Sequence, residues 1–239
     1  MTGTTIAGVF AHPDDETFGA SSAILEMGRR GDRFVLQTFT PGDAGKAGRF
    51  APLTKPELAE RRKRELKDAA DILGIASICQ LDYGDGKLKE IPLAQLIRDT
   101  ADFLNKERAS IVLTFPEDGI YGHPDHVAVH YAVKEAVFGG LCPGVQKLYY
   151  YASEALQQAG RKPAIVLDTS SDWPTKAQAL QAHETQLASI HRVFGNLTDF
   201  ASVPREARYE GFVLAWERGV EWPAQREAYF TDGLLPEPN

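Results

Sequence analysis

Two short segments of this sequence hold most of the side chains that could bind a metal ion or move a proton. Residues 11–16 read Ala-His-Pro-Asp-Asp-Glu, and residues 121–126 read Tyr-Gly-His-Pro-Asp-His. Burying carboxylates beside a sheet is costly unless they are paired or bind a cation, because an isolated charge resists leaving water. The first segment alone could also be a solvated turn in which Asp14 or Asp15 caps the following helix.

Both segments stand where strands of a parallel sheet would end. Residues 5–10 and 110–115 are short continuous apolar runs, typical of parallel strands covered on both faces. Strand and helix patterns alternate along the chain, which predicts an α/β fold: a Rossmann-like, mostly parallel sheet with helices on both faces. Ligands of such sheets collect beyond the carboxyl ends of the strands, so we expect the two segments to meet in one site.

Periodicity and the placement of glycine and proline predict the remaining elements. A helix over residues 55–73 would turn Arg62 and Glu65 inward, three positions apart and able to pair. A long helix over residues 173–194 would include His183 on an apolar stripe. Further strands are expected at residues 33–40, 78–81, 147–151, 164–167 and 212–216, and further helices at 17–30, 91–104 and 124–138. No linker or repeat interrupts the pattern, so residues 1–239 are predicted to form a single domain.

The composition fits one globular domain and disfavours several classes of partner. The chain has 239 residues, of which 43% are apolar, and a net charge of -7. An acidic surface does not attract nucleic acid or an anionic membrane, and no apolar run reaches the roughly 18 residues of a membrane helix. Cys79 and Cys142 match no disulfide or thiolate-metal pattern, and the N-terminus lacks a secretory pattern. We therefore expect a cytoplasmic protein without nucleic-acid or membrane partners; a homo-oligomer is compatible with the sequence.

The residue types of the two segments match a hydrolytic metal site. Zinc in such a site takes three nitrogen or carboxylate ligands and keeps one position open for water. His12, Asp15 and one histidine of the second segment would supply that set. His126 is a better candidate than His123, because it lies inside the start of a predicted helix. His130, one turn further on, has the spacing of a fourth ligand, although a buried structural position fits it better.

The remaining polar residues of the two segments would surround the metal. Asp14 would lie beside it without being a ligand, and His123 and Asp125 would face it from the opposite wall. Amide hydrolysis needs such groups: a base for the attacking water and a donor for the developing oxyanion. Two histidines and one aspartate accept Zn²⁺ and also Fe²⁺. Glu16 has no role in this scheme, and we expect it to support a ligand by hydrogen bonding.

The motifs His-Pro-Asp-Asp-Glu and His-Pro-Asp-His, in this order and each after a strand, resemble the PIG-L/LmbE-like zinc-dependent N-deacetylases. Arg62-x-x-Glu65, Asp85-Gly86 and His183-x-x-Gln186 are similar to weaker landmarks of that family. The resemblance implies a zinc-dependent hydrolase that removes the N-acetyl group from an N-acetylglucosaminyl-type conjugate. The acidic composition disfavours a membrane glycolipid, so we favour a small soluble glycoside as the substrate. The resemblance also implies His12, Asp15 and His126 as metal ligands.

The same resemblance implies the catalytic and substrate-binding residues. Asp14 would be the general base that later protonates the departing amine. His123, oriented by Asp125, would be the cation that faces the oxyanion, and Tyr121 would be a second donor to it. The resemblance further assigns two residues to sugar binding, Arg62 and Asp85.

Two other functions fit parts of the sequence. A metal-dependent hydrolase of another bond, such as a phosphoester, could use the same ligands, but a phosphate site should show more inward basic residues than Arg62. A sugar-nucleotide binding module with a degenerate site is the alternative from another class. The acids after the first strand argue against it, because they would repel a pyrophosphate. Metal analysis separates these functions, since stoichiometric zinc favours a hydrolase.

Overall fold

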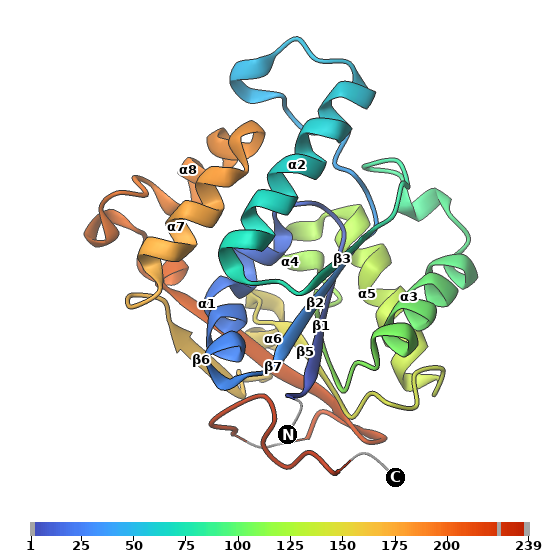
Figure 1. The fold of residues 1–239 in the computed structure, drawn as a ribbon. Coiled ribbons are helices and arrows are strands. Elements are labelled where there is room, and N and C mark those ends of the chain that lie inside the picture. The colour runs from blue at the N-terminus through green and yellow to red at the C-terminus, as the bar shows by residue number, and fades with distance from the viewer. Residues whose placement is uncertain (1–2, 224–225, 237–239) are drawn as a thin grey trace.

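A computed structural model describes residues 3–223 and 226–236, and these form one mixed sheet with helices on both faces (Figure 1). The strands are β1 Thr5–Phe10, β2 Arg33–Thr38, β3 Ser77–Gln80, β4 Ile111–Thr114, β5 Lys147–Tyr151, β6 Ile165–Asp168, β7 Tyr209–Glu217 and β8 Val220–Glu221. Their order is β3-β2-β1-β4-β5-β7-β6, with β8 paired to β7. Strands from β3 to β5 are parallel, and β7 is antiparallel to its neighbours. The predicted α/β fold is confirmed.

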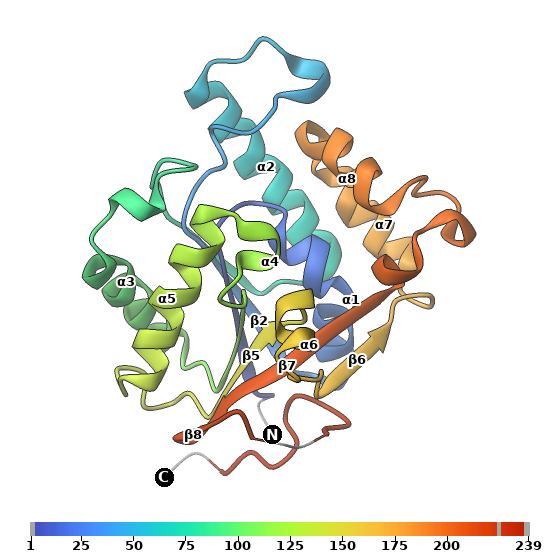
Figure 2. The same cartoon turned by 180° about the vertical axis from the view of Figure 1, so that it is seen from behind.

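The helices divide between the two faces as right-handed crossovers require. They are α1 Asp15–Arg30, α2 Lys55–Leu73, α3 Leu93–Glu107, α4 Gly119–Gly122, α5 Pro124–Phe138, α6 Glu154–Gln158, α7 Trp173–Ala182 and α8 Leu187–Phe194. Helices α1, α2 and α7 pack together on one face, and α3 packs against α5 on the other (Figures 1 and 2). The chain changes face between β3 and β4. This change places the loops after β1 and β4 next to each other.

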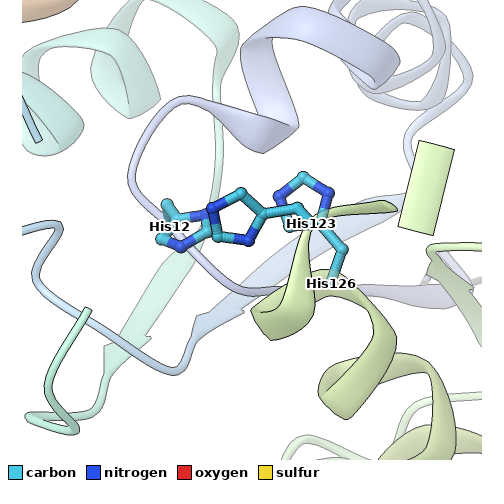
Figure 3. Close-up of side chains that lie close together, drawn as sticks. All are labelled: His12, His123 and His126. Atoms are coloured by element: carbon cyan, nitrogen blue, oxygen red, sulfur yellow. The ribbon is translucent and has the colours of Figure 1, made fainter. Parts of the chain in front are cut away.

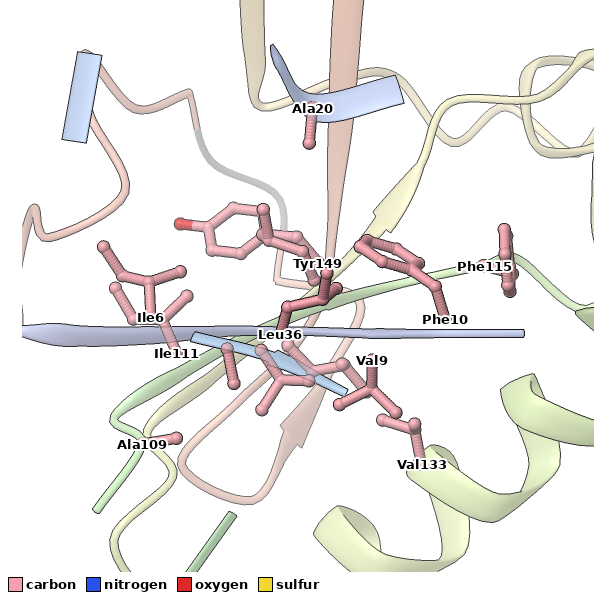
Figure 4. Close-up of a cluster of buried hydrophobic side chains, with 14 of the residues drawn as sticks. Ile6, Val9, Phe10, Ala20, Leu36, Ala109, Ile111, Phe115, Val133 and Tyr149 are labelled. Carbon is pink, nitrogen blue, oxygen red and sulfur yellow. The ribbon is translucent and has the colours of Figure 1, made fainter. Parts of the chain in front are cut away.

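The hydrophobic core lies on both sides of the central strands (Figure 4). Strand β4 is buried at every residue and β1 at all but the first, which explains their continuous apolar sequences. Ala20 of α1 lies on one side of the sheet and Val133 of α5 on the other. Two apolar layers therefore hold rigidly the strand ends that carry the motifs.

Several predicted boundaries agree with the structure. Strands β1 and β5 and helices α2 and α5 have the predicted limits. Thr54 and Glu57 form a capping box before α2, and Gly74 ends the helix in the left-handed region. The short elements α4, α6 and β8 were not predicted, because they contain too few residues for a periodic pattern.

The prediction of one long helix over residues 173–194 is wrong. Helix α7 ends at Ala182, a 3-10 turn covers Glu184–Gln186, and α8 then begins. His183 at the break has φ -80° and ψ 61°, which is not helical. Leu180 and Ile190, on either side of the break, are both fully buried, so the apolar pattern continues across it and conceals it.

No helix in the described parts of the chain is long and apolar enough to cross a membrane. The predicted limits of the domain, residues 1–2 and 237–239, lie outside the residues that the structure describes.

Candidate active site and metal centre

Loops at the carboxyl ends of three parallel strands bring the two motifs together. His12 follows β1, and His123 and His126 belong to the loop after β4 and the first turn of α5. Figure 3 shows the three imidazole rings gathered at this point. Asp85 reaches the same place from the loop after β3. The expectation that both motifs form one site is therefore met.

Two of the predicted ligands, His12 and His126, lie next to the carboxylate of the third, Asp15. His12 Nδ1 lies 3.4 Å from Asp15 Oδ2, and His126 Nε2 lies 3.3 Å from Asp15 Oδ1. Burial works against the charge of Asp15, but His126 and His12 hold its pKa well below the usual range. An ionised carboxylate between two imidazoles matches the chemistry of a divalent metal site.

The hydrogen bonds of His126 suit a metal ligand. Its Nδ1 lies 3.2 Å from the carbonyl oxygen of Gly119, so Nδ1 carries the proton and Nε2 keeps a lone pair. Nε2 is buried and makes no hydrogen bond among the described residues, although Asp15 Oδ1 lies 3.3 Å from it. A buried acceptor without a donor is costly, and a metal ion would compensate it. The residues present therefore fit a divalent metal ion.

Other histidines differ in how close they come to this cluster. Ligand atoms of His12, His123 and His126 lie within 4.8 Å of one another, so His123 is also within reach of an ion. His130 instead lies 3.0 Å through Nδ1 from the carbonyl oxygen of Phe115 and does not line the cavity of the site. The structure thus places His130 in the core, as its apolar surroundings suggested.

Asp14 has an unusual backbone conformation. Its φ of 119° and ψ of -27° lie in a region that residues with a Cβ rarely adopt, at a cost of about 1–3 kcal/mol. Burial raises the pKa of its carboxyl group to about 6, Arg62 opposes this rise, and Asp15 adds to it. The site therefore holds Asp14 under strain, with a carboxylate less acidic than usual.

Arg62 forms hydrogen bonds with the segment that contains Asp14. Its guanidinium lies 3.1 Å from Asp14 Oδ2, and it also donates to the carbonyl oxygens of Pro13 and Gly42. The side chain is buried in the wall of the site. Arg62 is thus placed to orient Asp14, and its contact with a sugar stays a prediction.

Arg62 and Glu65 both turn inward as predicted, but no hydrogen bond or ion pair joins them within the described residues. Glu65 accepts hydrogen bonds from Thr185 N at 3.1 Å and Thr185 Oγ1 at 2.7 Å, and its Oε1 lies 3.3 Å from Arg61 Nε. The i, i+3 spacing made a pair with Arg62 geometrically feasible. Arg62 and Glu65 each form hydrogen bonds with groups from other parts of the chain instead.

The carboxylate of Asp125 contacts His12 rather than His123. Its Oδ2 lies 3.2 Å from His12 Nε2 and accepts from Gly86 N, and Oδ1 accepts from Leu88 N. The predicted contact of Asp125 with His123 is therefore made by the main chain, while the carboxylate bonds to other groups. The only hydrogen bond between these two described residues runs from the main-chain N–H of Asp125 to His123 Nδ1, at 3.2 Å.

Three carboxylates surround the imidazole of His12. Asp85 Oδ1 lies 3.2 Å from His12 Nε2, the same distance as Asp125 Oδ2. Burial disfavours the charged imidazole, but hydrogen bonds to Asp125, Asp15 and Asp85 outweigh it and raise the pKa of His12 well above its ordinary value. The negative charge of these three carboxylates around the ring of His12 is a second reason why the site suits a cation.

The surroundings of His123 favour its neutral form. Burial, together with the nearby His12 and His126, lowers its pKa, and its Nδ1 accepts a hydrogen bond. A neutral ring with this hydrogen bond carries its proton on Nε2, and the cationic role that the family resemblance implies stays a prediction. Tyr121 lies edge-on against His123 and His126 and is 72% exposed, so its hydroxyl is free to meet a ligand.

A cavity of about 680 Å³ opens over the cluster. Its inner end holds the motif residues, including Asp14, Asp15 and Arg62. Its outer part is lined by α8 and by the segment before and within β7: Ser189, Arg192, Val193, Glu206 and Tyr209. Within the described residues, neither Arg192 nor Glu206 has an ion-pair partner. These residues carry no motif, so the sequence offered no signal for them.

Comparisons with known proteins agree with this geometry. Residues 8–137 match the family model PIG-L, described as GlcNAc-PI de-N-acetylase. A probable N-acetyl-alpha-D-glucosaminyl L-malate deacetylase 2 of Bacillus anthracis is 34% identical over 188 residues, which is 76% of this chain and 80% of the relative. The diacetylchitobiose deacetylase of Thermococcus kodakarensis is 33% identical over 186 residues, covering 73% and 67% of the two chains.

Solved structures share the fold at lower identity. The N,N'-diacetylchitobiose deacetylase of Pyrococcus horikoshii superposes with a TM-score of 0.66 at 20% identity, over 88% of this chain and 83% of its own. A 4-carboxy-2-hydroxymuconate hydratase of Pseudomonas putida superposes equally well, with a TM-score of 0.66 at 22% identity, over 91% and 98%. The fold alone thus supports different reactions. The family match and the relatives above 30% identity show that this chain belongs to the PIG-L (GlcNAc-PI de-N-acetylase) family.

Proposed function

We propose that this protein is a metal-dependent hydrolase that removes the N-acetyl group from an N-acetylglucosaminyl-type conjugate and releases acetate and a free amine. The observation that carries the proposal is the cluster of His12, Asp15 and His126 beside Asp14, at the inner end of a deep cavity. The named relatives above 30% identity are deacetylases of such conjugates.

We assign the metal to His12, Asp15 and His126, with zinc as the expected ion and Fe²⁺ as the alternative that the same donors accept. The lone pair on His126 Nε2 supports this assignment, and so does the central carboxylate of Asp15. When bound, such an ion supplies Lewis-acid chemistry, polarising the acetyl carbonyl and making water more acidic.

Asp14 is the general base in this proposal. Its carboxylate lines the cavity beside the ligand cluster, and Arg62 fixes one of its oxygens at 3.1 Å. It takes a proton from the attacking water and later gives it to the departing amine. Arg62 prevents Asp14 from turning away during these two transfers.

Two donors are available to the oxyanion that forms at the acetyl carbon. His123 offers Nε2–H, and Tyr121 offers its hydroxyl from the exposed rim. Donors held in place before the reaction stabilise a developing charge without having to reorganise. We assign both residues to this role, with His123 acting as a neutral donor.

The outer part of the cavity supports a conjugate rather than a lone sugar as substrate. Arg192 and Glu206 place charges of both signs there, next to the ring of Tyr209. Hydroxyl groups both donate and accept hydrogen bonds, so this lining fits a neutral polyhydroxy aglycone better than a strongly charged one. We therefore favour a small soluble glycoside, with Arg62 and Asp85 as further polar groups near the sugar.

We place the enzyme in the cytoplasm, without nucleic-acid or membrane partners. Cys79 and Cys142 are free thiols, which suits a reducing compartment. The acidic composition supports the lack of polyanionic partners.

A substrate screen tests the proposal. The purified protein is assayed for acetate release from N-acetylglucosamine, N,N'-diacetylchitobiose and the malate and inositol conjugates, with and without a chelator, and its metal content is measured. We expect near-stoichiometric metal, turnover of at least one conjugate, and loss of turnover with chelator that Zn²⁺ or Fe²⁺ restores. Turnover of 4-carboxy-2-hydroxymuconate without any acetate release would overturn the proposal.

A further inference from the structure

The strained main chain of Asp14 is held by a buried side chain that has no role in the mechanism above. Asp14 has φ 119°, and its N–H donates to Glu16 Oε2 at 3.1 Å. Glu16 is fully buried, with 0% of its surface exposed. Since the residue is part of the first turn of α1, its carboxylate folds back onto the residue that precedes the helix. It does not reach the metal cluster, contrary to our expectation that Glu16 supports a ligand.

The other oxygen of Glu16 is held by two donors. Thr17 Oγ1 donates to Glu16 Oε1 at 2.6 Å, and His183 Nε2 lies 3.2 Å from the same oxygen. A buried carboxylate needs several donors, because each unsatisfied lone pair adds to the cost of leaving water. His183 is the only one of these donors that comes from outside α1 and its cap.

His183 is itself fixed firmly. It is 0% exposed and lies at the break between α7 and α8. Its Nδ1 has no hydrogen-bond partner among the described residues, so the proton belongs on Nε2, facing Glu16. The next residues are tied to α2, with Glu184 paired to Arg61 and the main-chain N–H of Thr185 bonded to Glu65. The break between α7 and α8 thus holds Nε2–H of His183 at a fixed position, where it can donate to Glu16.

We propose that Glu16 and His183 form a positioning pair for the general base: His183 holds the Glu16 carboxylate, and Glu16 holds the strained main chain of Asp14. The pair acts on the main chain, while Arg62 acts on the Asp14 carboxylate. This inference rests on the proposed role of Asp14 as the base. A pair that served only to pack α1 against α7 would affect stability but not the chemical step.

Three variants and a control separate these roles. His183→Phe removes the donor and keeps the ring, His183→Gln restores a donor of similar reach, and Glu16→Gln removes one of two acceptors with little change in shape. Thr185→Val is the control, because it removes a buried hydrogen bond from the same segment without touching Glu16. Kinetics use N,N'-diacetylchitobiose and the malate conjugate, together with metal content and exchange of the Asp14 amide hydrogen by NMR.

We expect His183→Phe and Glu16→Gln to lower kcat about tenfold or more, with KM within about twofold and metal content unchanged, since a small misplacement of a catalytic group slows the reaction strongly. Exchange of the Asp14 amide should become faster in both variants. His183→Gln should recover most of kcat, and Thr185→Val should leave kcat and the Asp14 amide unchanged. Unchanged exchange and kcat in Glu16→Gln would overturn the inference, whether or not His183→Phe folds.

A double-mutant cycle with Asp14→Asn separates this inference from the proposed function. If the pair acts through Asp14, Glu16→Gln lowers the rate in the wild-type background but not the residual rate of Asp14→Asn. An equal loss in both backgrounds would overturn the positioning role while leaving the base assignment intact. A wild-type rate in Asp14→Asn alone would overturn the base assignment itself.

Discussion

Asp14 and Asp15 are adjacent carboxylates with opposite environments. Asp15 lies between two imidazoles, which keep its pKa well below its usual range. Burial raises the pKa of Asp14 to about 6, although its ion pair with Arg62 opposes the rise. Neighbouring residues of the same type thus divide into a candidate metal ligand and a candidate proton carrier, because each one faces different groups.

Replacing the base should abolish turnover without removing the metal. Asp14→Asn removes the proton acceptor but keeps the size of the side chain, so we expect kcat to fall by about 10² to 10⁴. Metal content, measured on the purified variant, should equal that of wild type. Loss of the metal together with activity would instead identify Asp14 as a ligand.

The histidine pair on α5 offers a matched test of the metal site. His126→Asn should lower metal content strongly, since it removes the buried lone pair at the cluster. His130→Asn, one turn further on, should keep the metal, because that ring lies outside the ligand cluster and does not line the cavity. Mass-spectrometric metal analysis of both variants decides this. Metal loss in His130→Asn alone would reverse the assignment.

At the scale of elements, the loop after β2 is shaped around Arg62. Gly42 has φ 72°, and a Cβ built on it would lie 2.1 Å from Arg62 Nη1. The loop therefore needs glycine for two reasons, its backbone conformation and the close approach of the guanidinium. Helix α2 positions Arg62, and this loop accepts a hydrogen bond from the guanidinium group of Arg62.

Gly42→Ala should consequently reduce activity as well as stability. The left-handed conformation alone costs about 1–2 kcal/mol for alanine, and displacement of Arg62 should lower kcat about tenfold through loss of Asp14 orientation. Thermal unfolding and kcat are measured together. Gly140→Ala is the control, since Gly140 also has φ 72° but nothing lies within 4 Å of its Cβ position. A similar kcat in both variants would contradict this role of the loop.

At the scale of the molecule, an early and a late part of the chain build one cavity. Residues 12–126 supply the reactive groups, and α8 with the start of β7 supplies the outer wall. The break at His183 separates α7 from α8, and residues of α8 line the cavity. Substrate preference should therefore depend on the late part of the chain and reactivity on the early part.

This division predicts a selective effect at Arg192. Arg192→Ala should raise KM for conjugates about tenfold, since it removes contacts to the aglycone made equally in the ground and transition states. Kinetics with N-acetylglucosamine alone should be unchanged. Lys63→Ala, which removes an exposed cation of α2 outside the cavity, serves as the control. Equal effects on the free sugar and the conjugates would exclude an aglycone contact.

The sequence by itself determined the parallel core and the meeting of the two motifs. Continuous apolar runs predicted β1 and β4, and the end rule for parallel sheets placed His12 and His126 together. The limits of α2 and α5 were readable because their capping residues and periodicity are local in sequence. These features depend on neighbours along the chain, which a sequence displays directly.

Only the tertiary structure decided the partners of the polar residues. Arg62 bonds to Asp14 rather than Glu65, Asp125 faces His12, and His183 leaves its helix to meet Glu16. Each contact joins residues far apart in sequence. A buried charged side chain forms hydrogen bonds with whichever polar groups the packing brings within about 3 Å. Periodicity predicts which side chains turn inward. It does not predict which groups they meet there, because that depends on how the layers pack.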